Sequence, residues 1–304
     1  MTMLSPAERR SLLLANLICL ASMVIWASGL PAADLIIPYM PPIALTAARA
    51  TLAAMVLLPV WWALEGPEAV LGADWLTGAG VGFVTLGLAS FFVIVALQFN
   101  DPVTVAIVTA VMPVAGITLE CLADKRPFTK ALALGLILSV AGGLIAVSGS
   151  EGHLDLGVGV LAALASVLCY TWGSRETVRA LPALTPLGRS AITVAGCAVV
   201  VLVAALGDGL IRGNWPQWSA IGAPELAGLA IFGIGSMAVS QLLWIISVGQ
   251  IGIGAASMHM NAVPFYVMLM VFALGGPWNW AQTFGAGIVV IGALVAQGLI
   301  WRQR

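Results

Sequence analysis

SMHMNAVPFYVMLM, residues 257–270, places a histidine, an asparagine and a proline inside an otherwise apolar run. Proline has no N–H to donate and its ring collides with the preceding turn, so it interrupts or bends a helix. Pro264 has a counterpart 151 residues earlier, Pro113 in VMPVAG, residues 111–116. The same interruption in both halves of a chain predicts a structure built from two related halves.

The sequence around the two prolines extends this match. Each proline is followed by a polar turn and a glycine-rich run, LALGLILSVAGGLIAV (residues 132–147) in one half and TFGAGIVVIGALVAQ (residues 283–297) in the other. The first apolar runs also correspond, because Ile25-Trp26-Ala27-Ser28 matches Thr171-Trp172-Gly173-Ser174. These matches indicate an internal duplication.

The composition places the two halves in a membrane. Hydrophobic residues make up 61% of the 304 residues and charged residues only 8%, against about 45–50% and about 25% in a soluble domain. A bilayer core of about 30 Å is crossed by roughly 20 apolar residues in a helix. Charges, prolines and glycine-rich turns divide the chain into ten such runs, at 11–33, 42–64, 75–98, 102–122, 128–149, 156–178, 185–207, 224–248, 252–274 and 280–301.

Five of these runs fall in residues 1–150 and five in residues 151–304, which we expect to form two repeats of one integrated membrane domain. Because five is odd, the second repeat enters the membrane from the opposite side. We therefore predict an all-α membrane protein whose ten transmembrane helices form two inverted five-helix repeats around a central cavity. That architecture is typical of secondary transporters, which bind their substrate near mid-membrane between the repeats.

The basic residues indicate the orientation of the chain, because Lys and Arg accumulate on the cytoplasmic side. With the N-terminus in the cytoplasm, Arg212 is the only basic residue outside and Arg49 lies within the second run. The inside residues are Arg9, Arg10, Lys125, Arg126, Lys130, Arg175, Arg179, Arg189, Arg302 and Arg304. We expect a multi-pass protein of the bacterial cytoplasmic (inner) membrane with both termini cytoplasmic.

Other functional classes lack their signatures in this sequence. The net charge of −1 provides no basic surface for nucleic acid. There is no GxSxG or HExxH motif and no pair of intramembrane aspartates, so we expect no enzyme. The four cysteines, Cys19, Cys121, Cys169 and Cys197, lie in apolar runs without metal-ligand or disulfide spacing. We therefore expect no cofactor and no metal.

The Trp-small-Ser elements, the proline in each fourth run and the glycine-rich fifth runs together resemble the drug/metabolite transporter superfamily, and within it the EamA-type exporters. The resemblance extends over nearly the whole chain and rests on the conjunction of these features. It implies a ten-helix carrier that moves amino acids or related metabolites out of the cytoplasm. A complete pair of inverted repeats in one chain is compatible with a monomer in the lipid bilayer.

Two departures from the superfamily narrow the substrate. The small multidrug-resistance relatives depend on a glutamate in the first helix, whereas the first run here has no carboxylate. The sugar-phosphate carriers bind phosphate with basic residues in the cavity. Here Arg49 is the only basic residue well inside a run, about 10 Å from its outer end at roughly 1.5 Å per residue, so phosphate substrates are disfavoured.

Polar side chains in apolar runs point away from lipid, and helical spacing sorts them by face. In the eighth run, Ser236, Ser240 and Trp244 form one stripe that continues to Ser247, with Gln241 beside it, and Thr85 is the counterpart of Ser236 in the third run. We predict that these residues face the cavity and bind substrate. Small hydroxyls at this spacing are also typical of close helix packing, and both interpretations stay open.

Aromatic residues and a histidine complete the candidate set. Trp26 and Trp172 fit either a cavity wall or an anchor at the membrane interface, and Tyr170 adds a hydroxyl to the sixth run. Aromatic faces suit an apolar side chain and attract an ammonium group. His259 is predicted to face the cavity, with packing against a neighbouring helix as the alternative.

The backbone near the two prolines is a further candidate. We expect the helices to bend at Pro113 and Pro264 and to free the carbonyls of Thr109 and Met260, which can accept the ammonium of an amino acid. Asp101 precedes Pro102 and is predicted to cap the fourth run.

The predicted function is the export of amino acids or related small neutral metabolites by alternating access. The expected partners are this small-molecule substrate and the lipid bilayer. The alternatives are an efflux carrier for drugs or toxic metabolites of the same superfamily, or a passive solute channel.

Overall fold

The computed structural model describes residues 6–123, 129–148 and 157–296, and the elements within these ranges are all helical. The prediction of an all-α fold is confirmed for these residues, and their apolar helices are consistent with a membrane protein. Six stretches are long and apolar enough to cross a membrane: Ser11–Asp34, Pro42–Leu71, Trp75–Phe99, Val158–Ala180, Pro186–Arg212 and Ala223–Ile251. Four shorter apolar helices cover Pro102–Gly116, Ala133–Gly142, His259–Ala273 and Trp280–Gly292.

The helices of the first half begin with two long ones, and short 3-10 or π segments lie between some of them. In chain order they are α1 (Pro6–Asp34), η1 (Ile37–Tyr39), α2 (Pro42–Leu71), α3 (Trp75–Gly82), η2 (Phe83–Leu88), α4 (Ala89–Phe99), α5 (Pro102–Thr109), α6 (Met112–Ala123) and α7 (Lys130–Ser148).

The helices of the second half follow the same order of long and interrupted segments. They are α8 (Val158–Ala180), α9 (Pro186–Arg212), η3 (Trp218–Ala220), α10 (Ala223–Ala230), η4 (Ile231–Val239), α11 (Ser240–Ser257), η5 (Met258–Ala262), α12 (Val263–Ala273) and α13 (Trp280–Ala296).

Long apolar side chains are exposed along the outer surface of these helices. Leu17 on α1, Ile137 on α7 and Val203 on α9 are 61%, 64% and 66% exposed. An isolated exposed leucine is ordinary in a soluble protein, but large contiguous apolar surfaces are not. This surface is therefore suited to contact with lipid tails.

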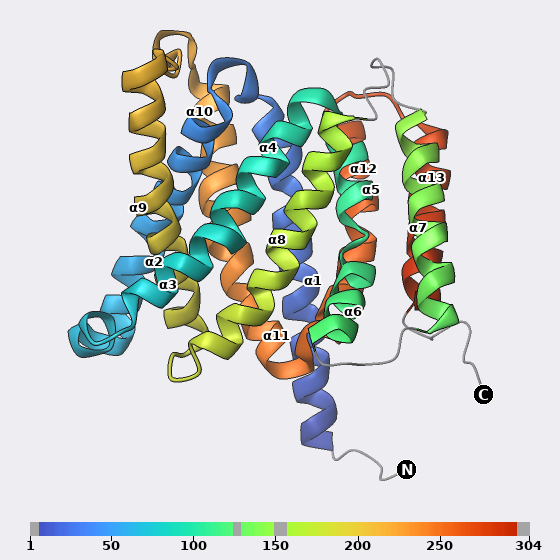
Figure 1. The fold of residues 1–304 in the computed structure, drawn as a ribbon, viewed down its shortest axis with the longest axis horizontal. Coiled ribbons are helices and arrows are strands. Elements are labelled where there is room, and N and C mark those ends of the chain that lie inside the picture. Colours follow the sequence, from blue (N-terminus) through green and yellow to red (C-terminus); the bar gives the residue numbers. More distant parts are fainter. Residues whose placement is uncertain (1–5, 124–128, 149–156, 297–304) are drawn as a thin grey trace.

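Consecutive long stretches run alternately up and down the molecule (Figure 1). The described start of α1 and the described end of α13 lie at the same face, which is the lower one in that view, as does the connection between α8 and α9. The connection between α9 and α10 lies at the opposite, upper face.

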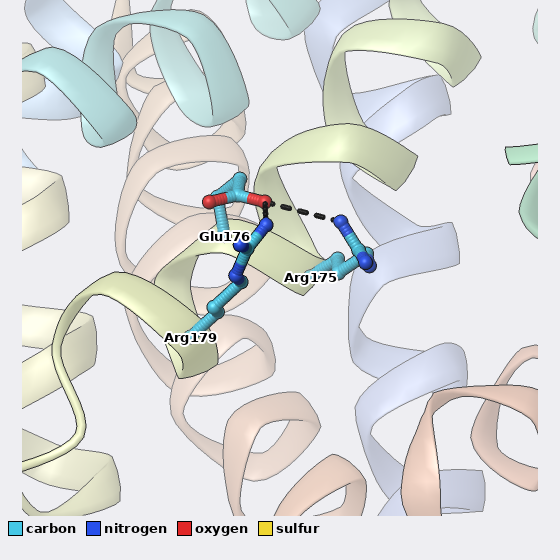
Figure 2. A network of polar contacts seen from close by, with 3 residues as sticks. All are labelled: Arg175, Glu176 and Arg179. Atoms are coloured by element: carbon cyan, nitrogen blue, oxygen red, sulfur yellow. Dashed lines mark hydrogen bonds and ion pairs between the residues drawn. The ribbon is translucent and has the colours of Figure 1, made fainter. Parts of the chain in front are cut away.

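Arginines are concentrated where α8 ends and α9 begins. Arg175 and Arg179 share the carboxylate of Glu176, with N–O distances of 3.3 and 3.5 Å (Figure 2). Arg189 donates to two backbone carbonyls of the connection, at 2.8 and 3.0 Å. Arg212 lies at the other end of α9. Lys125, Arg126, Arg302 and Arg304 lie outside the described residues.

Helices of the two halves pack mainly against each other. The contact between α7 and α13 is extensive, and so is that between α2 and α9. In addition, α1 packs on η4 and α11, while α8 packs on η2 and α4. Each of these contacts joins the first half of the chain to the second, so the core is shared between them.

Glycines allow two of these contacts to be close. A Cβ at Gly142 of α7 would lie 2.7 Å from the carbonyl oxygen of Gly285 and 2.8 Å from the backbone N of Val289, both on α13. A Cβ at Gly173 of α8 would overlap the side chain of Thr85 in η2. Any larger residue at these positions would push the two helices apart.

The helices carrying the two prolines are interrupted just before them. The helix α5 ends at Thr109 and α6 begins at Met112, while the 3-10 segment η5 precedes α12, which begins at Val263. The expectation of a free carbonyl at Met260 is wrong, because that carbonyl accepts the N–H of Val263. The tighter 3-10 turn supplies the partner that the proline cannot.

Candidate functional site

A small cavity lies between helices of both halves. The first half contributes α1, α2, η2, α4, α5 and α6, and the second contributes α8, η4, α11 and η5. The lining residues are Met23, Trp26, Leu30, Arg49, Thr85, Leu86, Ala89, Ser90, Val93, Thr109, Met112, Ser166, Val167, Tyr170, Phe232, Ser236, Met237, Gln241 and Met260.

Five of the residues singled out from the sequence lie in this lining, namely Trp26, Thr85, Tyr170, Ser236 and Gln241. Thr85 belongs to the π segment η2 and Ser236 to the π segment η4. A π segment inserts extra backbone into a helical turn and often marks a functional site. The structure therefore brings two π segments, one from each half of the chain, to the same cavity.

The other four candidates lie outside the lining. Trp172 is 37% exposed, and Trp244 is fully buried with its ring centroid 6.3 Å from that of Tyr170. Trp244 therefore supports a lining residue from behind. His259 is half-buried in η5, while its neighbour Met260 reaches the cavity. Ser240 is buried and faces α1.

The lower part of the serine stripe holds helices together. The Ser22 hydroxyl donates to the Ser240 carbonyl at 2.7 Å, and the Ser247 hydroxyl lies 3.3 Å from the Ala15 carbonyl, so both contacts join α1 to α11. The two interpretations of the stripe thus apply to different members. Ser236 belongs to the cavity, whereas Ser240 and Ser247 belong to the helix contact.

Arg49 is the feature that sequence reasoning did not assign to the cavity. Its side chain is 5% exposed and is the only charged one in the lining. Its Nη1 donates to the Ser90 hydroxyl at 3.2 Å and its Nη2 to the Ser236 hydroxyl at 3.3 Å. The guanidinium carbon also lies 3.9 Å from the ring centroid of Phe232, a cation–π contact. The sequence does mark Arg49 in one way, because it is the only basic residue well inside an apolar run.

The partners of Arg49 within the described part of the chain are neutral. No carboxylate there forms an ion pair with it, and its Nε has no hydrogen-bond partner. Ser236 in turn donates to the Trp26 carbonyl at 3.2 Å. The serines therefore hold the guanidinium in place without neutralising it.

A second polar pair lies across the cavity lining. The Tyr170 hydroxyl donates to the Gln241 side-chain carbonyl at 2.8 Å. Gln241 is 3% exposed, and its Nε2 has no partner among the described residues. A buried donor without a partner costs about 1–3 kcal/mol. Like Arg49, this amide presents hydrogen-bond donors that a ligand can satisfy.

Three lining hydroxyls are oriented by the backbone instead. Thr85 donates to the Val81 carbonyl at 2.6 Å, and Ser166 donates to the Ala89 carbonyl at 2.8 Å. Thr109 donates to the carbonyl three residues earlier at 2.9 Å. Because the hydrogens are used, the oxygen lone pairs remain as acceptors. The cavity thus combines cationic and amide donors with neutral acceptors and aromatic walls.

Two sequence comparisons found similarity to transporters. Residues 13–148 match the model of the EamA-like transporter family. The Bacillus subtilis (strain 168) protein described as "Uncharacterized transporter YyaM" is 26% identical over 275 residues, 86% of each chain.

A solved crystal structure is also similar to the chain. It has a TM-score of 0.68 and 23% identity, and the match covers 95% of this chain and 99% of that one. At this identity the likeness concerns the fold alone. The described part of the chain therefore has apolar helices long enough to cross a membrane, and residues 13–148 match the model of a transporter family.

Proposed function

We propose that the chain is a secondary transporter that exports amino acids or related small neutral metabolites from the bacterial cytoplasm by alternating access. The observation that carries this proposal is the cavity, because both halves line it: Trp26 and Arg49 from the first, Tyr170 and Ser236 from the second. A site shared in this way changes its exposure when one half moves against the other.

The proposal includes ten membrane crossings in two inverted repeats, residues 1–150 and 151–304. The packing supports this arrangement, since the contact of α1 with η4 and α11 is mirrored by that of α8 with η2 and α4. The α2–α9 and α7–α13 contacts each pair a helix with its own equivalent. The concentration of arginines at the lower face supports cytoplasmic termini, by the positive-inside rule.

The lining favours small solutes with an apolar part and a zwitterionic head. Trp26 and Tyr170 provide aromatic surface, and the narrower resemblance of the sequence to the amino-acid exporter YddG stays a prediction. Efflux of cationic drugs is less favoured, because the one charged lining residue, Arg49, is positive and repels a cation.

Reconstitution into liposomes tests the proposal. Proteoliposomes loaded with an unlabelled amino acid should take up the same labelled amino acid with saturable kinetics, faster than vesicles loaded with buffer. This acceleration arises because a carrier returns sooner when it is occupied. Flux that neither saturates nor responds to internal amino acid would indicate a passive channel and contradict alternating access.

A further inference from the structure

We infer that Arg49 is the anchor for a carboxylate on the transported solute, so that the substrates are small monocarboxylates with an apolar body. The inference rests on the proposed function for the claim that the solute is transported. It concerns which part of the solute the protein recognises, and the described contacts of Arg49 carry it.

Arg49 is buried without a counter-ion in the described part of the chain. An arginine stays protonated in proteins, and removing its charge from water costs several kcal/mol unless an anion compensates. Here the side chain is 5% exposed, and no carboxylate in the described part of the chain pairs with it. Intramembrane charges kept at such a cost mark functional sites.

Three neutral side chains hold the Arg49 guanidinium in position. Ser90 and Ser236 each take one N–H of the guanidinium, and Phe232 covers its face. A guanidinium has five N–H donors in a rigid fork that fits a carboxylate with two parallel bonds. The Nε remains without a partner, and so does the Nε2 of Gln241 in the same lining. The site therefore offers more donors than the protein itself satisfies.

The single positive charge of the cavity lining favours a carboxylate over a phosphate group. A phosphate group carries nearly two negative charges, whereas the lining supplies one positive charge and no other basic residue. A single carboxylate balances that charge. The hydroxyl oxygens of Thr85, Ser166 and Thr109 remain as acceptors, which suits an ammonium group elsewhere on the same solute.

Binding of two chemical triads to the purified full-length protein in nanodiscs tests the inference. The first triad is leucine, 3-methylbutylamine and 4-methylpentanoate, and the second is phenylalanine, 2-phenylethylamine and 3-phenylpropanoate. Within each, the second compound lacks the carboxylate and the third lacks the amine. Inorganic phosphate is the competing anion. Thermal stabilisation at increasing concentration gives an apparent affinity that does not depend on transport.

We expect at least one amino acid or its deaminated acid to bind about 10- to 100-fold more tightly than the matching amine, as for a hydrogen-bonded charged pair. Arg49→Gln should abolish this difference, Arg49→Lys should keep part of it, and the exposed control Arg179→Gln should keep all of it. The melting temperature of unliganded Arg49→Gln should not fall, because an uncompensated charge has been removed.

The opposite results separate the two proposals. If the amines bind as tightly as the acids, if phosphate binds more tightly than every carboxylate, or if Arg49→Gln lowers stability and leaves binding unchanged, the anchor role is wrong. If carboxylates bind through Arg49 but amino acids show no accelerated exchange, the anchor stands and the proposed export of amino acids fails.

Discussion

Two tryptophans that the sequence makes equivalent have different surroundings in the structure. Trp26 lines the cavity, whereas Trp172 is 37% exposed. The reason is helical geometry: Tyr170 and Trp172 are two residues apart, which places them about 200° apart around the helix. Because α8 turns Tyr170 and Ser166 toward the cavity, Trp172 must face elsewhere. A repeat matches positions along the chain but does not fix the rotation of each helix.

This difference predicts the effect of two matched substitutions. Trp26→Ala removes an aromatic wall of the cavity and should lower kcat/KM for exchange about 10-fold. Trp172→Ala should leave exchange within about 2-fold of wild type, because its side chain is outside the lining. Initial rates in proteoliposomes, normalised to the inserted protein, provide the measurement. Equal losses in both variants would show that the cavity is not the transport site.

The position of Arg49 in the cavity could not be predicted from the sequence. The sequence marks it as a lone charge in an apolar run, and counting residues gives its depth along the helix. Its contacts come from Ser90, Phe232 and Ser236 on two other segments. The approach of those segments depends on how the halves pack, so sequence spacing could not place Arg49 in the cavity. Thr85, Ser236 and Gln241 were easier to predict, because a polar residue on an apolar helix must avoid lipid.

At the scale of the elements, the apolar runs predicted where most helices lie but not how they are interrupted. The cap of α5 is confirmed, since Asp101 accepts the N–H groups of Val103 and Thr104, both at 3.0 Å. The π segments η2 and η4 had no counterpart in the prediction. Hydrogen-bond register within a helix responds to neighbours, such as the close approach of Gly173 to Thr85, and periodicity does not encode it.

The glycines of the α7–α13 contact allow a matched test of packing. Gly142→Ala places a methyl group 2.7–2.8 Å from backbone atoms of α13, which cannot move aside easily, so we expect a loss of about 1–3 kcal/mol. Gly287→Ala on α13 has nothing within 4 Å of its new Cβ and should gain up to about 1 kcal/mol of helix propensity. Thermal unfolding in detergent should therefore shift in opposite directions. A fall of similar size in both would contradict the close contact.

At the scale of the whole molecule, the halves are joined by side-chain hydrogen bonds at the upper face, where α5 and α13 begin (Figure 1). The Gln282 amide donates to both carboxylate oxygens of Asp101, at 2.9 and 3.0 Å. The repeat in the sequence predicted two halves. Their interlocking contacts were not predictable, because nothing in a single run specifies which distant run will cover it.

A cross-link at this position should stop a carrier but not a pore. In a protein whose own cysteines are replaced, Asp101→Cys with Gln282→Cys should lose amino-acid exchange on oxidation and regain it with a reductant. The physical reason is that alternating access requires the two halves to separate at each face in turn. Each single-cysteine variant controls for the lost hydrogen bonds. Exchange that continues in fully cross-linked protein would contradict movement at this face.

The contact between α7 and α13 also has a consequence for biosynthesis. The side of α7 that carries Gly142 is covered by α13, which the ribosome makes after every other described helix. Before α13 is synthesised, this side of α7 must contact lipid or the insertion machinery instead. The α7–α13 contact can therefore form only after every other described helix has been synthesised.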